Sequence, residues 1–143
     1  MRVDDSGLQV LSRAECLELL SSAEIGRIVF TDHALPAVQP VNFCLRDGHI
    51  VIRTNPGSKL AAATRHAVVA FEADDFDTLA RTGWSVTAVG RARAVQDEAE
   101  RARLAELPLR PWAPGDRSHY IVIRIEQVSG RRIIAAHESA TPA

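Results

Sequence analysis

The stretch Arg53-Thr54-Asn55-Pro56-Gly57-Ser58-Lys59 lies between an apolar run and a run of good helix formers. The preceding residues, His49-Ile50-Val51-Ile52, predict a strand, and the following Leu60-Ala61-Ala62-Ala63 predict a helix. Asn-Pro-Gly between them is typical of a turn. The stretch therefore predicts a strand that ends in a turn and is followed at once by a short helix over about 58–65.

Lys59 is the only lysine in a chain that otherwise uses arginine. The hydroxyl side chains of Thr54 and Ser58 precede it. Helix N-termini offer unpaired N–H groups and a partial positive charge, so they attract anions such as phosphate. One hypothesis is therefore a phosphate site at Thr54, Ser58 and Lys59. The alternative is that Ser58 only caps the helix and Lys59 is solvated, because Gly-Ser-Lys lacks the full P-loop pattern.

Upstream of this stretch, the sequence predicts one helix and a meander of three strands. Ser12-Arg13-Ala14-Glu15 matches a capping box and predicts a helix over 13–21. Runs rich in β-branched and aromatic residues predict strands over 26–31, 37–45 and 49–54. Asp47-Gly48 is typical of a hairpin turn between the last two strands. Pro40 cannot donate to a strand ladder, so it indicates an edge or a bulge.

Downstream, polar connections alternate with further apolar runs. The same criteria predict strands over 67–73, 84–95 and 120–128, a loop over 74–82 and a charged helix over 97–107. Gly90 indicates a bulge that bends the second of these strands, and the last strand can continue through 130–134 after another bulge. About six short antiparallel strands with helical connections favour a barrel closed on itself, in a mainly β protein with short helices.

The length of 143 residues fits one domain with a real core. We expect a single domain over 1–143, with its core over about 12–134 and frayed tails at 1–7 and 136–143. The net charge of −1 argues against nucleic acid as the main partner. No apolar run reaches the ~20 residues that cross a bilayer, and the N-terminus lacks an apolar signal segment, so we expect a cytoplasmic protein.

Neither a metal site nor a nucleophile is predicted. The histidines are scattered singly, at positions 33, 49, 66, 119 and 137. Cys16 and Cys44 form no metal-type pair and are expected to be reduced thiols that pack in the core. The acidic clusters at 74–77 and 97–100 are interpreted as a solvated loop and a helix start, and the pair at 131–132 as a solvated strand end.

Two further stretches have both a functional and a structural interpretation. Pro40-Val41-Asn42-Phe43 combines a proline with an amide in one strand, so its irregular ladder can leave backbone groups free to face a ligand. It can equally be a strand with an outward polar residue. Trp84-Ser85-Val86 can belong to the core or the rim, or lie against a planar cofactor or a partner subunit.

Taken in order, these pieces resemble the pyridoxamine 5′-phosphate oxidase-like family of FMN-binding split β-barrel proteins. The resemblance covers roughly residues 12–128. The stretches that carry it are Glu24-Ile25-Gly26-Arg27-Ile28-Val29-Phe30, Leu35-Pro36-Ala37-Val38-Gln39-Pro40-Val41-Asn42-Phe43, Ile50-Val51-Ile52-Arg53-Thr54 with Gly57-Ser58-Lys59, Val68-Val69-Ala70-Phe71-Glu72, and Gly83-Trp84-Ser85-Val86 with Gly90-Arg91-Ala92.

The resemblance implies a six-stranded antiparallel split β-barrel that forms a homodimer, with FMN in clefts between the subunits. The cofactor-binding residues that it implies fall into three groups. Pro40, Val41, Asn42 and Phe43 would run along the flavin ring. Arg53, Thr54, Ser58 and Lys59 would hold the phosphate. Trp84, Ser85 and Val86 would reach the flavin from the other subunit.

The resemblance further implies an FMN-dependent oxidoreductase acting on a small substrate, with no catalytic side chain that the residues identify. The chain is shorter than pyridoxamine 5′-phosphate oxidase itself and lacks that enzyme's Arg- and His-containing C-terminal signature, so the vitamin is not the expected substrate. Substrate contacts are expected from the loops 31–36, 74–83 and 108–119. The alternatives are a deazaflavin or haem in the same barrel, with His33, His49 or His66 as a haem ligand, or a non-catalytic flavin-binding sensor or storage dimer.

Overall fold

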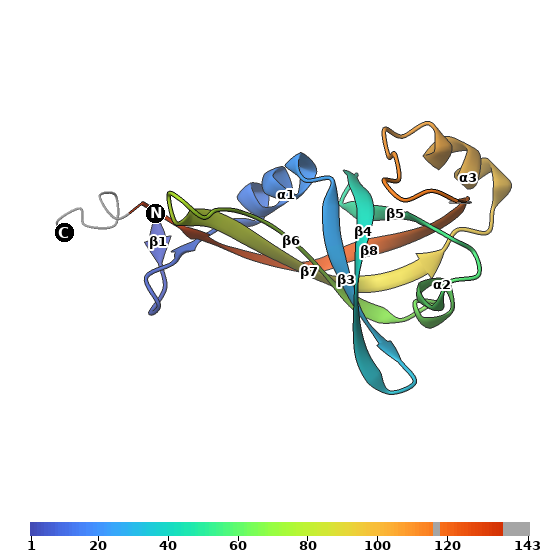
Figure 1. Cartoon of the computed structure of the whole chain (residues 1–143), viewed down its shortest axis with the longest axis horizontal. Helices are drawn as coiled ribbons and strands as arrows, with labels where there is room; N and C mark the ends of the chain where they lie inside the picture. Colours follow the sequence, from blue (N-terminus) through green and yellow to red (C-terminus); the bar gives the residue numbers. More distant parts are fainter. Residues whose placement is uncertain (116–117, 136–143) are drawn as a thin grey trace.

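The computed structural model describes residues 1–115 and 118–135 (Figure 1). The strands are β1 (Arg2–Val3), β2 (Gln9–Val10), β3 (Ile25–Asp32), β4 (Leu35–Arg46), β5 (His49–Thr54), β6 (Val68–Asp77), β7 (Thr82–Ala94) and β8 (His119–Ile133). The helices are α1 (Arg13–Ser22), α2 (Lys59–Ala63) and α3 (Glu98–Ala105). Each element that the sequence predicts is present, with shifts at the ends.

The six strands β3 to β8 close into a ring within the described residues. Every pairing is antiparallel, and the order is β8, β5, β4, β3, β6, β7 and back to β8. This confirms the predicted six-stranded barrel. The ring is split, because β4 pairs with β5 only from Phe43 to Arg46 and has no partner on that side over Leu35–Asn42. Pro40 lies in this free half, so the predicted local edge is confirmed.

Two apolar clusters stabilise the barrel. The larger fills its inside, because alternate residues of each strand point inward. Its largest fully buried members include Phe71, Ile28, Ile50, Ile52, Ile121 and Ile123. The smaller cluster lies on the outward face of β5 and β8 beneath α3, and comprises Val51, Val95, Leu104, Leu109, Tyr120 and Val122. The outside of the barrel is therefore apolar where α3 covers it.

Side-chain caps determine where the helices start. Ser12 and Glu15 form the predicted capping box of α1, and the side chains of Ser58 and Asp97 cap α2 and α3 by accepting from backbone N–H groups. Helix α1 buries Cys16 and Leu20 against the barrel. None of the helices in the described part is long and apolar enough to span a bilayer.

The N-terminal segment is ordered, so the prediction of a loose tail over 1–7 is wrong. Strand β1 pairs with β2, and β2 pairs with β8. The Asp4 carboxylate accepts from the N–H groups of Ser6 and Leu8 and pairs with Arg131 at 2.9 Å. Arg131 is consequently a half-buried partner of the N-terminus rather than a solvated strand end. The predicted tail at 136–143 lies outside the described residues.

The predicted loop over 74–82 is also wrong, because β6 continues to Asp77 and pairs with β7 from Thr82 onward. Asp77 accepts from the N–H groups of Leu79 and Ala80 and so stabilises the turn between the strands. The hairpin extends away from the barrel toward the left of Figure 1, where its side chains are exposed. Strand pairing uses backbone groups, so an exposed hairpin arm needs no alternating apolar pattern.

Gly90 lies at the predicted irregularity of β7. The register shifts between Val89, which pairs with Gln127, and Gly90, which pairs with Ile125, so the additional residue belongs to β8. A Cβ on Gly90 would lie 1.7 Å from the carbonyl oxygen of Arg124. The two backbones therefore approach too closely for any side chain at this position.

Candidate functional site

The predicted cofactor residues of β4 and β5 lie on the two sides of the split in the barrel. The last pair between these strands is Phe43 with Ile52, so residues 40–42 and Thr54 continue on diverging strands. Val41 and Phe43 are buried in the core, whereas Pro40 and Asn42 lie on the outward face. Val41 and Phe43 would therefore contact a ligand in the split through their backbone atoms rather than through their buried side chains.

The predicted phosphate residues Thr54 and Ser58 come together at the end of β5. Thr54 is 2% exposed, and its hydroxyl lies 3.4 Å from that of Ser58. Ser58 also accepts from the N–H of Ala61 at 3.1 Å. The exposed Lys59 follows directly, and it forms no ion pair among the residues that the structure describes. Two hydroxyls and one free cation therefore occupy a single corner of the barrel.

Arg53 lies on the other face of β5 from Thr54, because successive strand residues alternate. Its guanidinium donates to the carbonyl oxygen of Leu109 at 3.1 Å and lies over the ring of Tyr120, 5.3 Å from the centroid. The structure therefore separates Arg53 from the hydroxyl pair and places it against the connection between α3 and β8.

A cleft of about 530 Å³ lies between β4, Glu24 just before β3, and the segment 108–112. Asn42 and Phe43 line one side of it. The side-chain oxygen of Asn42 accepts from the N–H of Trp112 at 3.0 Å. This volume is in the range of small-molecule pockets. Trp112 itself was not singled out from the sequence, although it belongs to the connection 108–119, from which substrate contacts are expected.

Trp84, Ser85 and Val86 follow one another on β7, and Trp84 borders this cleft, because it lines an adjoining cavity of about 360 Å³ together with Glu24 and Trp112. They pair with Asp75, Asp74 and Ala73 on the hairpin arm, at the opposite end of the molecule from α2 in Figure 1. Val86 is buried in the core, whereas Trp84 is half-buried. Within one chain, the structure therefore does not bring these residues to Ser58 and Lys59.

A charged network that sequence reasoning missed lies on the outward face of β3 and β6. Arg27 contacts Glu72 at 3.0 Å and Asp74 at 3.3 Å. Burial and the neighbouring Asp74 carboxylate raise the pKa of Glu72 to about 7, although Arg27 opposes this shift. Arg27 is 45 positions from Glu72 in the sequence, so only the pairing of β3 with β6 reveals the network.

In the described part of the chain, the remaining histidines, cysteines and carboxylates form no further candidate site. Among residues 1–115 and 118–135, no three His, Cys, Asp or Glu side chains are placed to hold a metal ion. Burial raises the pKa of both free thiols, Cys16 and Cys44, which makes them poor nucleophiles. Burial, together with Arg101 and Arg65, lowers the pKa of His119. His137 lies outside the described residues.

Comparison with known proteins identifies the family of this chain. The sequence profile of the family described as pyridoxamine 5′-phosphate oxidase matches residues 12–132. The chain belongs to the pyridoxamine 5′-phosphate oxidase family. An uncharacterized protein of Mycobacterium tuberculosis, Rv0080, is 43% identical over 137 residues, which cover 92% of this chain and 88% of that protein.

Solved structures of family relatives share the fold. The FAD binding protein from Mycobacterium smegmatis has a TM-score of 0.75 and 38% identity, and the match covers 87% of this chain and 98% of that one. An FAD-binding protein from Mesorhizobium loti has a TM-score of 0.72 and 26% identity, over 89% of this chain and 99% of that one. The resemblance noted in the sequence is thereby confirmed for the family and the fold.

Proposed function

We propose that this member of the pyridoxamine 5′-phosphate oxidase family is a flavoprotein and acts as an oxidoreductase on a small substrate. The flavin would be FMN, or the FMN half of FAD. The observation that carries the proposal is the corner formed by Thr54, Ser58 and Lys59 beside the split between β4 and β5. The FAD-binding proteins at 38% and 26% identity support a flavin in this family branch.

The residues at the split fit a flavin phosphate and ring. The hydroxyls of Thr54 and Ser58 are donors for phosphate oxygens, and Lys59 supplies the countercharge. Asn42 uses its side-chain oxygen for Trp112, so its NH₂ group, which has no partner in the described part, is left to donate to the ring. Arg53 would contribute by holding Leu109 at the edge of the cleft. The flavin itself supplies the redox chemistry when bound.

We further propose a homodimer, because Trp84 and Ser85 lie on the β6–β7 hairpin arm, at the opposite end of one chain from α2, which begins at Ser58 and Lys59 (Figure 1). A second copy would bring its own Trp84 and Ser85 toward the phosphate corner at Ser58 and Lys59. The outward face of the barrel offers a surface for that copy: Val38, Val29, Ala70 and Val89 form one cross-strand row over β4, β3, β6 and β7. Val38 is 63% exposed in this row. Burying such a row is a source of association energy.

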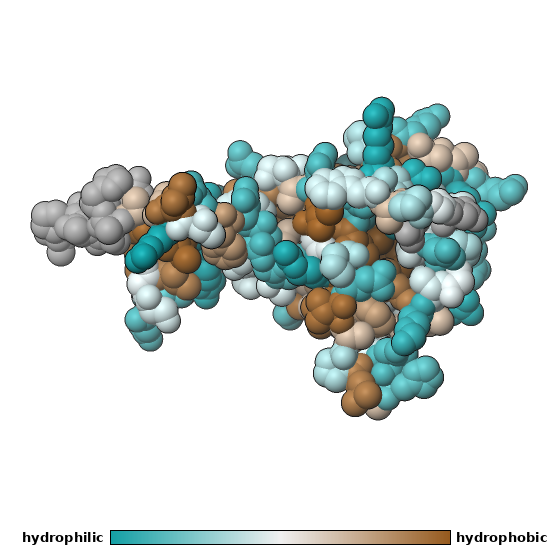
Figure 2. Space-filling view, in the orientation of Figure 1, coloured by the Kyte–Doolittle hydropathy of each residue, from teal (hydrophilic) through white to brown (hydrophobic). Residues whose placement is uncertain are grey.

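The space-filling view supports this assignment. Figure 2 shows apolar surface over the middle of the molecule and at the tip of the β3–β4 hairpin, among predominantly polar side chains. Leu35, next to that hairpin turn, is 68% exposed. We expect the protein to work in the cytoplasm, which the two free cysteines support.

The absorption spectrum of the purified protein tests the cofactor. We expect flavin bands, and we expect extraction followed by chromatography to release FMN or FAD. A deazaflavin band or a Soret band would instead identify the alternative cofactors. A protein that stays colourless after incubation with both FMN and FAD would contradict the proposal. If NAD(P)H does not reduce the bound flavin and no small electron acceptor oxidises it, the protein is not an oxidoreductase. A flavin-storage or sensor role would then take its place.

A further inference from the structure

A basic groove lies on the outward face of β5, β8 and β7, next to α3. We use this name for the surface formed by Arg46, Arg91, Arg93, Arg103, Arg124, His49 and His66. Two adjoining cavities of about 230 and 400 Å³ make up the groove, and both are lined by His49, Arg93 and Val122. The shared lining makes them one continuous surface.

Strand register explains why the cations gather here. His49 on β5 and Arg91 on β7 both pair with Arg124 on β8, so the three side chains form one cross-strand row. In the next row, Val51 and Arg93 both pair with Val122. Leu104 of α3 packs against this second row, and the first row remains uncovered. The groove therefore has an apolar floor beneath α3 and a cationic extension beyond it.

The carboxylates that line the groove are too few to cancel its positive charge. Five arginines line it against Asp47, Glu100 and Glu126, so it carries a formal excess of positive charge in a chain whose net charge is −1. The side chains of Arg103 and Arg124 form no hydrogen bond or ion pair among the described residues. Within the part of the chain that the structure describes, the Arg46 guanidinium has one ion pair, a long contact of 3.8 Å with the exposed Asp47. Three guanidinium groups are therefore available to a ligand.

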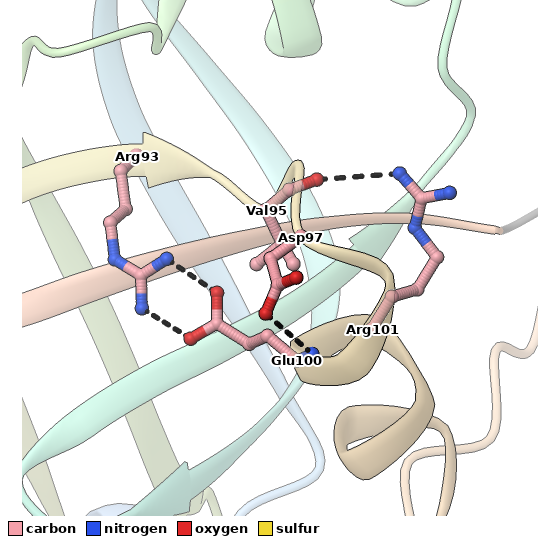
Figure 3. A network of polar contacts seen from close by, with 5 residues as sticks. All are labelled: Arg93, Val95, Asp97, Glu100 and Arg101. Atoms are coloured by element: carbon pink, nitrogen blue, oxygen red, sulfur yellow. Dashed lines mark hydrogen bonds and ion pairs between the residues drawn. The ribbon is translucent and has the colours of Figure 1, made fainter.

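Glu100 positions Arg93 rather than blocking the groove. Its two oxygens accept from the two terminal nitrogens of Arg93 at 2.7 and 2.8 Å, as Figure 3 shows. The N–H of Glu100 donates to Asp97, and Arg101 donates to the carbonyl oxygen of Val95, which ties α3 to the end of β7 (Figure 3). These contacts hold the helical wall of the groove in place.

We propose that the basic groove binds a small organic polyphosphate. Guanidinium groups recognise phosphate oxygens through paired, charge-assisted hydrogen bonds. The apolar floor at Val51, Val122 and Leu104 would receive the organic part of such a ligand. The groove is a different site from the proposed flavin corner, because none of Thr54, Ser58 and Lys59 lines either of its cavities. It would serve a second ligand, and the proposal does not rest on the flavin.

Calorimetric titration with ATP and with inorganic pyrophosphate tests the groove, with adenosine as the uncharged comparison. We expect saturable binding of both phosphates to the wild-type protein. Arg124→Gln and Arg103→Gln should each weaken it about tenfold, the usual loss for one charge-assisted hydrogen bond. Glu126→Gln should tighten it about two- to threefold by removing a repelling charge, a gain that misfolding cannot produce. Arg13→Gln on α1 removes the same charge elsewhere and should leave binding unchanged.

Three results would overturn the proposal that the basic groove binds a polyphosphate. Wild-type protein that binds neither phosphate would do so, as would equal weakening by Arg13→Gln and Arg124→Gln. Loss of binding in Lys59→Ala, with Arg124→Gln unaffected, would place the phosphate in the flavin corner instead. Because the flavin spectrum and the titration are measured separately, failure of one proposal can be told from failure of the other.

Discussion

Lys59 is the residue to which the proposed function assigns the most specific role. It is the sole lysine and follows the Thr54–Ser58 hydroxyl pair. In Lys59→Ala, we expect FMN affinity to fall about 10- to 100-fold, because a charge-assisted contact contributes ~1.5–3 kcal/mol. Riboflavin affinity should change little, since riboflavin has no phosphate. Fluorescence titration with both ligands measures the difference.

Arg65→Ala is the matched control for Lys59→Ala. Arg65 is exposed just beyond α2, so its removal lowers the charge of the same region without touching the hydroxyl pair. Its effect on FMN affinity should be small. If Lys59→Ala weakened FMN and riboflavin equally, Lys59 would have to lie away from the phosphate.

Glu72 makes stability depend on pH. Its pKa of about 7 in the folded protein lies above the ordinary value of 4.5, so the folded state holds the proton more tightly than the unfolded state. This stabilisation is present below about pH 4.5 and is lost as pH rises through about 7. Glu72→Gln cannot ionise, so relative to wild type it should be more stable at pH 8 than at pH 5.

Urea unfolding at several pH values measures this effect. The free energy of unfolding of the wild type should decline relative to that of Glu72→Gln between pH 5 and 8. Asp75→Asn, which removes an exposed carboxylate from the same strand, is the comparison. It retains Glu72, so its free energy of unfolding should follow the same pH trend as that of the wild type. If the free energies of unfolding of wild type and Glu72→Gln ran parallel between pH 5 and 8, Arg27 would have to keep Glu72 ionised over that range.

At the scale of elements, the close approach of β7 and β8 depends on Gly90. A methyl group there would meet the Arg124 carbonyl oxygen at 1.7 Å, so the strands must separate. We expect Gly90→Ala to lower the free energy of unfolding by about 2 kcal/mol or more, in the range of overpacked sites. The ring of strands closes through this pairing, and the basic groove spans it.

Gly57→Ala provides the comparison for Gly90→Ala. The nearest atom to a Cβ at Gly57 lies 3.6 Å away, at the side chain of Asn55, so the methyl group fits. The free energy of unfolding of Gly57→Ala should lie within about 0.5 kcal/mol of the wild-type value. Similar losses for both variants would mean that β8 can shift to accommodate Gly90→Ala.

At the scale of the whole molecule, we expect a dimer of twice the 15.6 kDa chain mass. Val38→Glu puts a charge at the most exposed residue of the apolar row and should shift sedimentation toward the monomer. Flavin affinity should fall with it, because the partner's Trp84 and Ser85 would be lost from the phosphate corner. Leu79→Glu, at a 95% exposed position in the turn of the hairpin arm, should keep the dimer.

Two outcomes would contradict this assembly. A monomeric wild-type protein would remove the second wall of the proposed flavin site. A dimer that survives Val38→Glu but dissociates in Leu79→Glu would place the interface on the hairpin arm, away from the barrel face.

The sequence by itself determined the local elements of this protein. The capping box at Ser12, the turn at Asp47-Gly48 and the cap at Ser58 each use contacts between residues a few positions apart, so the sequence pattern predicts them. The juxtaposition of Thr54 and Ser58 is equally local, at four positions apart. The predicted barrel followed from the number and length of the apolar runs.

Only the tertiary structure decided which distant residues share a face. The register of β3 with β6 unites Arg27 with Glu72, and the register of β5, β8 and β7 gathers the basic groove. Alternation along β5 turns Arg53 away from Thr54 toward Leu109. A strand shifted by one residue would reverse each of these faces, because side chains alternate with a period of two. Register depends on pairing between segments far apart in the chain, which no local pattern specifies.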